Sequence, residues 1–338
     1  ISGATRAFSA DIGLFNMKKL SICIPTYNRS AMLDNLLSSL LVQISASGRA
    51  ADIELLVSDN ASPDDTQMVA AKYRGQIRYW RNTENIGPDA NFLKLFGEAT
   101  GDFIWLPGDD DIVRDDGLSF ILRMIDQHDF DFLYLRTKGR IKHGWKLRNA
   151  RKLSNVEPLH SVNVYTTFMT SQVIRSSLIK PNLQAARVHL GGFMAYYWIF
   201  LESLAKSTKC FVSNEKEVFP GKTENTGGYR FYRVWGEAVM DVMHASSFAN
   251  DQKACAIMRF RLFFVLLLPI TYRLRSGGSR FSFHAENPAE GLRKYFSSDF
   301  YKIILLAYLR MPYFCLKPLH FGVRLIAHGI SKFQNDIV

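Results

Sequence analysis

Three consecutive carboxylates stand in the first half of the chain, shortly after an apolar segment. The segment Phe103–Leu106 is followed by a Pro-Gly pair and then by Asp109, Asp110 and Asp111. Like charges this close raise one another's pKa unless a cation lies among them, and carboxylate oxygens are ligands that suit Mg²⁺ or Mn²⁺. The alternative is a solvated Asp-rich turn, although a turn tolerates Ser, Asn or Gly at the same positions. The triplet therefore predicts a site for a divalent cation.

Two more polar loops follow apolar segments earlier in the chain. Pro25 ends the first segment and turns the chain, and Tyr27 then supplies an aromatic ring. Asp59 ends the second segment, where its carboxylate can accept a hydrogen bond from a nucleobase N–H or can cap a helix that begins near Asp64. A strand terminator with a packed aromatic is the structural alternative for the first loop, so neither loop is decisive alone.

The elements that must position these loops alternate between strand and helix. Short apolar, β-branched segments at 20–24, 53–58, 77–80, 103–106 and 132–135 alternate with helical patterns at 30–43, 65–73, 88–98 and 115–127. Such alternation predicts an α/β sandwich with a mostly parallel sheet, in which ligands bind beyond the carboxyl ends of the strands. The three polar loops are therefore expected to converge in space.

Charge is distributed unevenly over a chain with enough apolar residues for a globular core. The 338 residues are 47% apolar and carry a net charge of +11, a length typical of about two domains. Residues 1–135 hold 12 basic and 19 acidic side chains, whereas the remainder holds 30 basic and 12 acidic ones. The two parts of the chain are therefore expected to face different partners.

The cysteines and the first residues bear on the compartment. Cys23, Cys210, Cys255 and Cys315 lie far apart in apolar segments and form no C-x-x-C pair, which predicts reduced core thiols in a cytosolic protein. The first 16 residues lack the basic start and long apolar stretch of a signal peptide, and a natural start is suggested at Met17. Residues 1–17 are therefore predicted to be an extension or an expression remnant.

The second half of the chain becomes helical from residue 232 onward. Its most apolar stretches, at 258–269 and 303–310, are shorter than the roughly 20 residues that span a bilayer, so neither is predicted to be a transmembrane helix. Basic and aromatic residues interleave at 316–325, which favours helices on an anionic membrane surface. A buried helical subdomain with basic outer faces is the alternative. The basic segment 137–160 and the Gly-rich segment 220–230 are typical of mobile loops.

In combination, these segments resemble the family 2 glycosyltransferases of the GT-A fold. That family opens with an apolar strand and a Pro-Thr-Tyr-Asn-Arg run, which stand here at 22–29, and its second strand ends in an Asp-rich loop that matches 59–64. An Asn-x-Gly segment before a helix stands at 85–92, and the D-x-D metal motif follows the fourth strand. The resemblance covers about residues 18–135. Ser-Asp-Asn-Ala-Ser and Asn-Ile-Gly-Pro-Asp-x-Asn-Phe look most like the abequosyltransferase-type enzymes that add deoxysugars to bacterial O-antigen.

The resemblance implies an enzyme of class EC 2.4 that moves a hexose or deoxysugar from a nucleoside diphosphate to an acceptor hydroxyl. Asp110 is then expected to bind Mn²⁺ or Mg²⁺, with Asp111 as a second ligand or a contact to the donor sugar. A cation that bridges the diphosphate stabilises the charge on the leaving group. The residues expected to bind the donor are Pro25, Thr26, Tyr27, Arg29, Asp59, Asn85, Asp89 and Asp109, the last at the ribose.

The segment before the helix at 88–98 can serve either the ligand or the helix itself. Pro88 suits the first position of a helix, which leaves the N–H groups of residues 89–91 to face an anion. Asp89 fits a contact to a sugar hydroxyl or a helix cap equally well. Asn91 can reach the ligand or bridge backbone groups.

The catalytic base is the least determined part of the resemblance. Inverting members usually place a Glu-Asp pair about 80–90 residues after the metal motif, and this chain has no such pair there. The matching stretch at 187–202 offers His189, Tyr196 and Glu202. His189 precedes two glycines and has an ordinary pKa suited to proton transfer, so it is the candidate base, with a structural hydrogen-bonding role as the alternative. Whether the reaction inverts or retains the anomeric configuration stays open.

The expected organisation is a glycosyltransferase domain at 18–230 and a basic helical region at 231–338. Within the domain, 18–135 forms the nucleotide-binding half and 136–230 the acceptor half. Helices on a membrane surface would suit an acceptor linked to polyprenyl diphosphate, such as an O-antigen or other surface polysaccharide intermediate. We therefore expect a peripheral location on the inner face of the bacterial plasma membrane.

Two other functions compete with this interpretation. A sugar-nucleotide pyrophosphorylase needs a Gly-rich phosphate loop, where this chain has Pro-Thr-Tyr-Asn-Arg without a glycine. A non-catalytic protein that binds membranes or nucleic acid would fit the basic half. Since the sequence shows no RNA- or DNA-binding signature, no nucleic-acid partner is expected.

Overall fold

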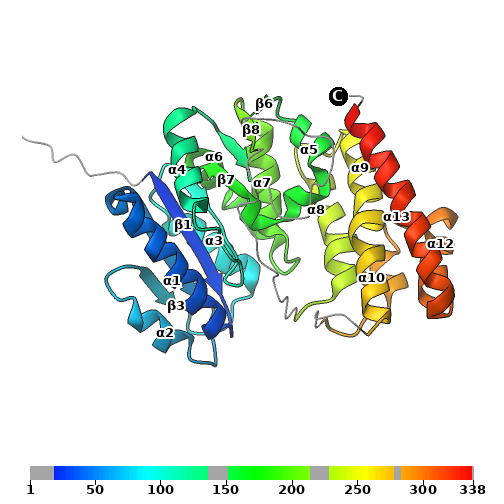
Figure 1. The fold of residues 1–338 in the computed structure, drawn as a ribbon, viewed down its shortest axis with the longest axis horizontal. Coiled ribbons are helices and arrows are strands. Elements are labelled where there is room, and N and C mark those ends of the chain that lie inside the picture. Colours follow the sequence, from blue (N-terminus) through cyan, green and yellow to red (C-terminus); the bar gives the residue numbers. More distant parts are fainter. Residues whose placement is uncertain (1–18, 136–150, 214–227, 278–282, 337–338) are drawn as a thin grey trace, which may run out of the picture.

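The structure, a computed structural model, describes residues 19–135, 151–213, 228–277 and 283–336. The predicted extension at 1–17 lies outside these residues, as do most of the basic segment 137–160 and most of the Gly-rich segment 220–230. Strands cluster at one end of the molecule, and long helices lie side by side at the other (Figure 1).

The first half alternates between strands and helices, as its sequence predicts. Its elements are β1 (Leu20–Thr26), α1 (Ser30–Ser47), the 3₁₀ turn η1 (Ala50–Asp52), β2 (Ile53–Asp59), α2 (Thr66–Lys72), β3 (Arg78–Arg81), α3 (Pro88–Glu98), β4 (Phe103–Trp105), α4 (Gly117–Gln127) and β5 (Phe132–Tyr134).

The second half contains short strands and mainly helices. Its elements are β6 (Arg151–Leu153), α5 (Glu157–Ser161), η2 (Asn163–Thr167), η3 (Met169–Ser171), β7 (Gln172–Arg175), α6 (Ser176–Ile179), η4 (Lys180–Asn182), η5 (Ala185–His189), α7 (Ala195–Lys206), β8 (Cys210–Val212), η6 (Arg233–Ala238), α8 (Val239–Ala245), α9 (Gln252–Arg261), η7 (Leu262–Leu267), α10 (Leu268–Arg275), α11 (Pro288–Leu292), α12 (Asp299–Arg310) and α13 (Tyr313–Asp336).

The described strands form one sheet of eight strands in the order β3-β2-β1-β4-β7-β5-β8-β6. The four strands β3, β2, β1 and β4 are mutually parallel, and β5 is parallel to β8. The strand β7 is antiparallel to both of its neighbours, β4 and β5, and β6 is antiparallel to β8. Four of the seven pairings are therefore parallel. These include every pairing between two strands of the nucleotide-binding half, 18–135.

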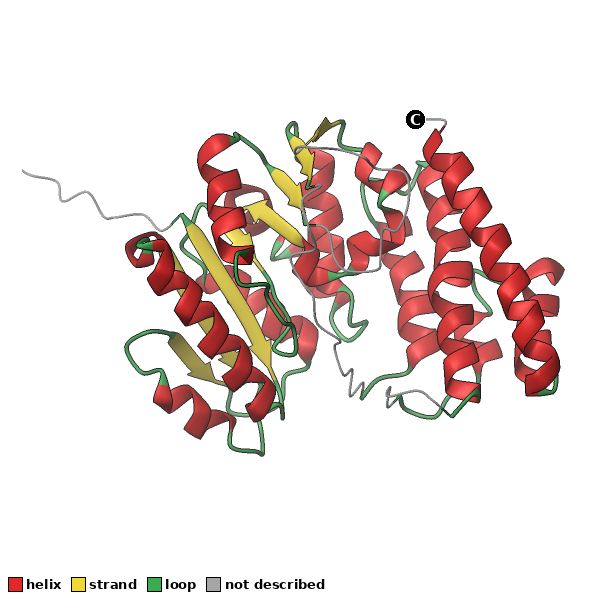
Figure 2. Ribbon diagram, in the orientation of Figure 1, coloured by secondary structure: helices red, strands yellow, loops and turns green. Residues whose placement is uncertain are grey.

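Helices cover both faces of the sheet because successive side chains of a strand point to opposite faces (Figure 2). Along β1, Ile22 and Ile24 enter a core shared with α1 and α4, whereas Cys23 enters a second core with α3 and α7. In α1 the leucines at 33, 36, 37 and 40 recur with helical spacing and are buried in the first core. This two-faced packing is the α/β sandwich that the sequence predicts.

The second core continues from α7 into the C-terminal helices. The rings of Phe231 and Phe263 are buried in it, together with the side chain of Leu316. The stretch Gln252–Arg275 joins α9, the π-helical η7 and α10, and by length and composition it could cross a membrane. The helix is longer than its apolar stretch at 258–269, so the length argument from the sequence was wrong here. Most of this stretch is nevertheless buried inside the protein.

The four cysteines are free thiols. Cys23, Cys210 and Cys255 are buried as predicted, and Cys315 is partly exposed. Burial raises the pKa of the Cys210 thiol to about 12, which makes it a poor nucleophile.

Candidate active site

The loops that follow β1, β2 and β4 meet at the carboxyl edge of the sheet, because these three strands are neighbours and parallel. The Thr26 hydroxyl donates to Asp109 Oδ2 at 2.8 Å, and Arg29 Nη1 donates to Asp109 Oδ1 at 2.9 Å. The same Arg29 nitrogen lies 3.7 Å from Asp110 Oδ1. The structure thus brings the first loop and the aspartate triplet together.

The three aspartates occupy different environments. Asp109 is buried, and burial raises its pKa to about 6 against the opposing effect of Arg29. Asp111 is buried as well, and its carboxylate accepts from the Gly108 N–H at 2.8 Å and from the Thr170 hydroxyl. Asp110 is the most exposed of the three, with 15% of its side chain accessible. Of the triplet, Asp110 therefore offers the most accessible oxygens to a ligand.

The donor set suits a hard cation that brings other ligands with it. Among the described residues, no group of three or more His, Cys, Asp or Glu side chains is arranged to hold a metal ion. Mg²⁺ usually keeps several waters and binds through one or two carboxylates together with substrate phosphates, so a full protein cage is not required. Asp110 fits such a cation, and Asp111 is partly committed to the loop.

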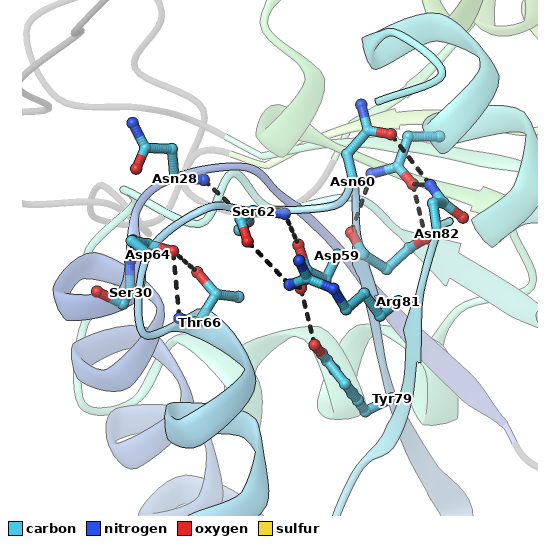
Figure 3. A network of polar contacts seen from close by, with 12 residues as sticks. Asn28, Ser30, Asp59, Asn60, Ser62, Asp64, Thr66, Tyr79, Arg81 and Asn82 are labelled. Carbon is cyan, nitrogen blue, oxygen red and sulfur yellow. Dashed lines mark hydrogen bonds and ion pairs between the residues drawn. The ribbon is translucent and has the colours of Figure 1, made fainter. Parts of the chain in front are cut away.

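Asp59 is fully buried and bonded on both oxygens (Figure 3). Its Oδ1 accepts from the Ser62 N–H at 2.8 Å. Its Oδ2 accepts from the Tyr79 hydroxyl at 2.8 Å and from Arg81 Nη1 at 3.0 Å. Three of the roughly four acceptor positions of a carboxylate are thereby used. Asp59 thus shapes the end of β2 more than it faces a ligand.

The first two loops are joined by hydrogen bonds between their backbones and side chains (Figure 3). The Asn28 N–H donates to Ser62 Oγ at 2.9 Å, and the Ser30 N–H donates to Asp64 Oδ2 at 2.8 Å. Asn28 and Ala61 have φ values of 56° and 62°, a left-handed conformation that is costly for residues other than glycine. The backbone at this edge is therefore held in a fixed shape.

The remaining residues of the first loop differ in exposure. Pro25 lies within β1 and is buried, and Thr26 is buried against Asp109. Tyr27, by contrast, is 45% exposed and presents its ring at the edge of the sheet. Tyr27 is therefore the residue of this loop best placed to pack against a flat ligand.

The loop before α3 is held by amide side chains. Asn85 Oδ1 accepts from Asn60 Nδ2 at 2.8 Å and from the Gly87 N–H at 2.9 Å. Asn91 Nδ2 donates to the Ser58 carbonyl at 2.9 Å, which is the backbone-bridging role considered for it. Asp89 is buried and accepts from the backbone N–H groups of residues 191, 193 and 195 rather than pointing to solvent.

Of the three candidate bases, two serve the structure. The Tyr196 hydroxyl donates to the Thr167 carbonyl at 2.6 Å, and Glu202 accepts from the backbone and hydroxyl of Ser247, both at 2.7 Å. His189 is partly exposed, and its ring packs on Trp198 with 5.1 Å between centroids. Burial lowers the pKa of His189, so its imidazole is neutral at pH 7 and can accept a proton.

Three residues of this region were missed by the sequence argument. Tyr79 and Arg81 lie two positions apart on β3, so their side chains share one face of the strand. This pair of polar residues after the Asp59 loop was the signal that the sequence offered. Thr170 lies 59 residues beyond Asp111, and no local pattern marks it. Side chains that support a site from a distant segment leave little trace in a single sequence.

Comparison with known proteins assigns this arrangement to a family. The model of the family "Glycosyl transferase family 2" matches residues 21–193. Abequosyltransferase RfbV of Salmonella typhimurium is 40% identical over 111 residues, which is 32% of either chain, so this chain spans about a third of the length of that relative.

Two solved structures share the fold. TarS 1–349 of S. aureus, in complex with UDP, has a TM-score of 0.59 at 18% identity over 93% of this chain and 90% of that one. The mannosyltransferase PcManGT of Pyrobaculum calidifontis, in complex with GDP-Man and Mn²⁺, has a TM-score of 0.52 at 12% identity over 94% and 87%. Both establish the GT-A type of fold. Since the family model covers just over half of the sequence, this chain belongs to glycosyl transferase family 2.

Proposed function

We propose that this glycosyltransferase moves a sugar from a nucleoside diphosphate to a hydroxyl of a glycan, with a divalent cation at Asp110. The observation that carries the proposal is the difference within the triplet. Asp109 accepts hydrogen bonds from Thr26 and Arg29, whereas Asp110 keeps 15% of its side chain accessible to solvent. Family membership favours this transfer over a pyrophosphorylase or a non-catalytic binding protein.

Mn²⁺ or Mg²⁺ would be held by Asp110, with Asp111 beside it in the same turn. When bound, such a cation supplies Lewis-acid stabilisation of a diphosphate leaving group. The PcManGT complex contains Mn²⁺ on the same type of fold, which supports a cation in this one. Arg29 would supply a second positive charge to the diphosphate, since its side chain is 24% exposed and its Nη1 lies 2.9 Å from Asp109 Oδ1 and 3.7 Å from Asp110 Oδ1.

We assign the nucleoside to the edge formed by Tyr27, Asp59 and Asn85. The exposed ring of Tyr27 would pack on the base or ribose, and Asp59 would fix the loop that surrounds it. We place the ribose beside Asp109, whose carboxylate is held in position by hydrogen bonds from Thr26 and Arg29. The TarS complex contains UDP, and the similarity to RfbV supports a deoxysugar donor for an O-antigen type of product.

We propose His189 as the general base for the acceptor hydroxyl. Its lowered pKa keeps the imidazole neutral at pH 7, which is the form that accepts a proton. Tyr196 and Glu202, the other candidates in this stretch, are bonded to the Thr167 carbonyl and to Ser247.

We propose that the outer face of α12 and α13 lies on an anionic membrane, where a polyprenyl-diphosphate-linked acceptor would be presented. The apolar side chains exposed there belong to Phe300, Ile303, Leu306, Phe314, Phe321 and Leu325. Between residues 300 and 325 the sequence has four Lys and Arg residues, all exposed, and no acidic one. Apolar side chains flanked by cations suit the interface of anionic lipids. The location would then be the cytoplasmic side of the bacterial plasma membrane.

The metal role is tested by Asp110→Ala, with Asp115→Ala, an exposed carboxylate in the same loop, as the control. First, thermal-shift screening against UDP-, GDP-, CDP- and dTDP-sugars with Mn²⁺ identifies the donor, because ligands of the native state raise its melting temperature. Asp110→Ala should then lower Mn²⁺-dependent donor turnover at least about 100-fold, and the control should not. Full turnover in the variant or in excess chelator would refute the metal role.

The membrane role is tested by sedimentation with vesicles that contain phosphatidylglycerol or only phosphatidylcholine. The double variant Phe314→Glu, Phe321→Glu should reduce binding to the anionic vesicles at least about tenfold. Met68→Glu, which changes an equally exposed apolar residue on α2, is the matched control. Equal binding by all three proteins, or no preference for anionic lipid, would contradict the proposed face.

A further inference from the structure

One carboxylate outside the aspartate triplet connects two segments more than 100 residues apart. Asp89 stands at the start of α3 and is 2% exposed. Its Oδ2 accepts from the Gly191 N–H at 2.9 Å and from the Phe193 N–H at 2.8 Å, and its Oδ1 accepts from the Ala195 N–H at 3.0 Å. Three charge-assisted bonds from one buried side chain fix the backbone of residues 191–195, here called the 191–195 loop.

The helix that begins at the end of this loop lacks a cap of its own. The α7 helix begins at Ala195, and the preceding residue, Met194, has no side chain that can accept the free N–H groups. Asp89 takes this role from a different helix. The two helices also pack directly, since the ring of Phe92 meets that of Tyr196 edge-on at 5.5 Å. Asp89 therefore fixes both the loop and the start of α7 to the donor side of the sheet.

The 191–195 loop has an unusual backbone that needs such support. Gly191 has a φ of 87°, and Phe193 has a φ of 65°, which is unfavourable for a residue with a large side chain. Burial raises the pKa of Asp89, and the backbone N–H donors oppose that rise. The three bonds hold Phe193 in a conformation that an unsupported loop would leave.

The ring of Phe193 packs on a second aromatic ring. Its ring centroid lies 5.8 Å from that of Tyr229. Tyr229 in turn lies close enough to Arg29 that its phenolic charge would raise the pKa of that guanidinium. Arg29 holds Asp109 and borders Asp110. Hydrogen bonds join Asp89 to the 191–195 loop, ring packing joins that loop to Tyr229, and an electrostatic interaction joins Tyr229 to Arg29 beside the aspartates.

We propose that Asp89 is a positioning residue that holds the 191–195 loop, and with it the Phe193–Tyr229 ring pair, as the acceptor-binding edge of the active site. The assignment of this edge to the acceptor rests on the proposed function. Donor-binding loops and the triplet follow the first strands of the sheet, and the 191–195 loop, from the second half of the chain, is joined to this part of the protein through Asp89. Apolar ring surfaces of this kind suit the C–H faces of a sugar residue in a glycan.

Hydrogen–deuterium exchange on the free protein tests the positioning without reference to any substrate. In the wild type, the amides of Gly191, Phe193 and Ala195 should be protected, the first although Gly191 is exposed, because Asp89 accepts from each. In Asp89→Asn their exchange should accelerate at least about tenfold, because an amide has one acceptor oxygen instead of two. Unprotected amides in the wild type, or unchanged rates in the variant, would overturn the positioning role.

The matched control is Asp131→Asn, because Asp131 also accepts from backbone N–H groups of a distant segment. It binds the N–H groups of Thr208 and Lys209 at 2.9 and 3.2 Å, at the opposite end of the sheet. Both variants should lose thermal stability, but only Asp89→Asn should alter exchange at 191–195. If the two variants change exchange there equally, Asp89 is a general stabilising residue and the proposal fails.

The link to the acceptor is tested by the balance between donor hydrolysis and transfer. With the sugar nucleotide selected by the thermal-shift screen and p-nitrophenyl glycosides as acceptor probes, Asp89→Asn should raise the acceptor KM at least about fivefold. Its donor KM should rise less than its acceptor KM, because all three hydrogen bonds of Asp89 go to the 191–195 loop. Phe193→Ala, which leaves Asp89 intact, should reproduce the acceptor effect with little change in Tm. An unchanged acceptor KM in both variants would overturn the acceptor assignment, whereas absence of any donor binding would count against the proposed function alone.

Discussion

The Tyr79 hydroxyl donates a hydrogen bond of 2.8 Å to the fully buried carboxylate of Asp59. Arg81, two residues further along β3, donates to the same oxygen at 3.0 Å. The two donors fix the carboxylate at the end of β2, and Asp59 in turn holds the Ser62 N–H in the adjoining loop. Arg81 also donates to the Ser62 carbonyl at 2.8 Å, so the shape of the proposed nucleoside site depends on side chains of the neighbouring strand β3.

Removing one donor should weaken nucleotide binding without unfolding the protein. We expect Tyr79→Phe to raise the Kd of the selected nucleotide about three- to tenfold, since one hydrogen bond to a charged group is lost. Arg81→Ala should have a larger effect, because Asp59 then loses its paired charge. Isothermal titration calorimetry measures both.

The control for this prediction is Tyr73→Phe. Tyr73 makes a similar bond of 2.6 Å to Asp34, but between α1 and α2 rather than at the edge of the sheet. Equal nucleotide affinity in all the variants would show that the Asp59 network does not shape the nucleoside site.

A second prediction concerns stability in mild acid. His320 is buried in the C-terminal helices, where its ring stacks on Tyr272 at 4.1 Å and its Nδ1 lies 2.8 Å from the Tyr308 hydroxyl. Burial, with a smaller effect of Arg324 and Arg273, lowers the pKa of His320 to about 4. Between pH 6.5 and 4 the unfolded chain binds a proton that the folded chain does not, so this contribution to stability is lost as the pH falls.

The measurement is urea unfolding at pH 7 and pH 4.5 for the wild type and for His320→Phe, which retains an aromatic ring but cannot titrate. The wild type should lose up to about 3 kcal/mol more than the variant between the two pH values. The comparison removes the contributions of all other titrating groups. Parallel pH profiles for the two proteins would contradict the prediction.

The third prediction concerns close packing at the start of β1. A Cβ atom added to Gly101 would lie 2.7 Å from Ser21 Oγ and 2.8 Å from the Ser21 backbone nitrogen. The Gly101 N–H also donates to Ser21 Oγ at 2.8 Å, so the two segments cannot separate without loss of this bond. We expect Gly101→Ala to destabilise the protein by about 1–3 kcal/mol.

Gly97→Ala is the matched control because Gly97 is exposed in the last turns of α3 and an added Cβ meets only one atom, at 4.0 Å. There the substitution should be neutral or stabilising by up to about 1 kcal/mol, since alanine favours the helix. Thermal unfolding of both variants decides the matter, and a Gly101→Ala protein as stable as the wild type would refute the packing argument.

The sequence determines the first half of the fold well, because strands and helices there have distinct periods. The helix at Pro88–Glu98 agrees with its prediction at both ends, since Pro88 sets its start. The antiparallel strand β7 was not predicted, because its pairing with β4 and β5 depends on contacts that no local pattern encodes. Helical structure was predicted at Gln252–Arg275, but the length of this helix was missed, since its apolar stretch is shorter than the helix.

For the site, the sequence placed the loops at one edge of the sheet but not the bonds between them. The order of β2, β1 and β4 brings Thr26 and Arg29 to Asp109. A parallel sheet is enough to predict that these loops meet, but not which side chains bond. The partners of Asp89 lie more than 100 residues away, so its role could only be described as a sugar contact or a cap. Long-range partners of buried carboxylates require three-dimensional information.

The position of β7 has a consequence for synthesis on the ribosome. Until residues 172–175 leave the exit tunnel, the outer edge of β4 has no partner strand, and the Thr170 hydroxyl cannot reach Asp111. Open strand edges on nascent chains promote association with other chains. A truncated product that stops before Gln172 would therefore expose the unpaired edge of β4 and would not hold the Thr170 hydroxyl against Asp111. The shortest fragment able to display the aspartates in their native arrangement must extend past Arg175.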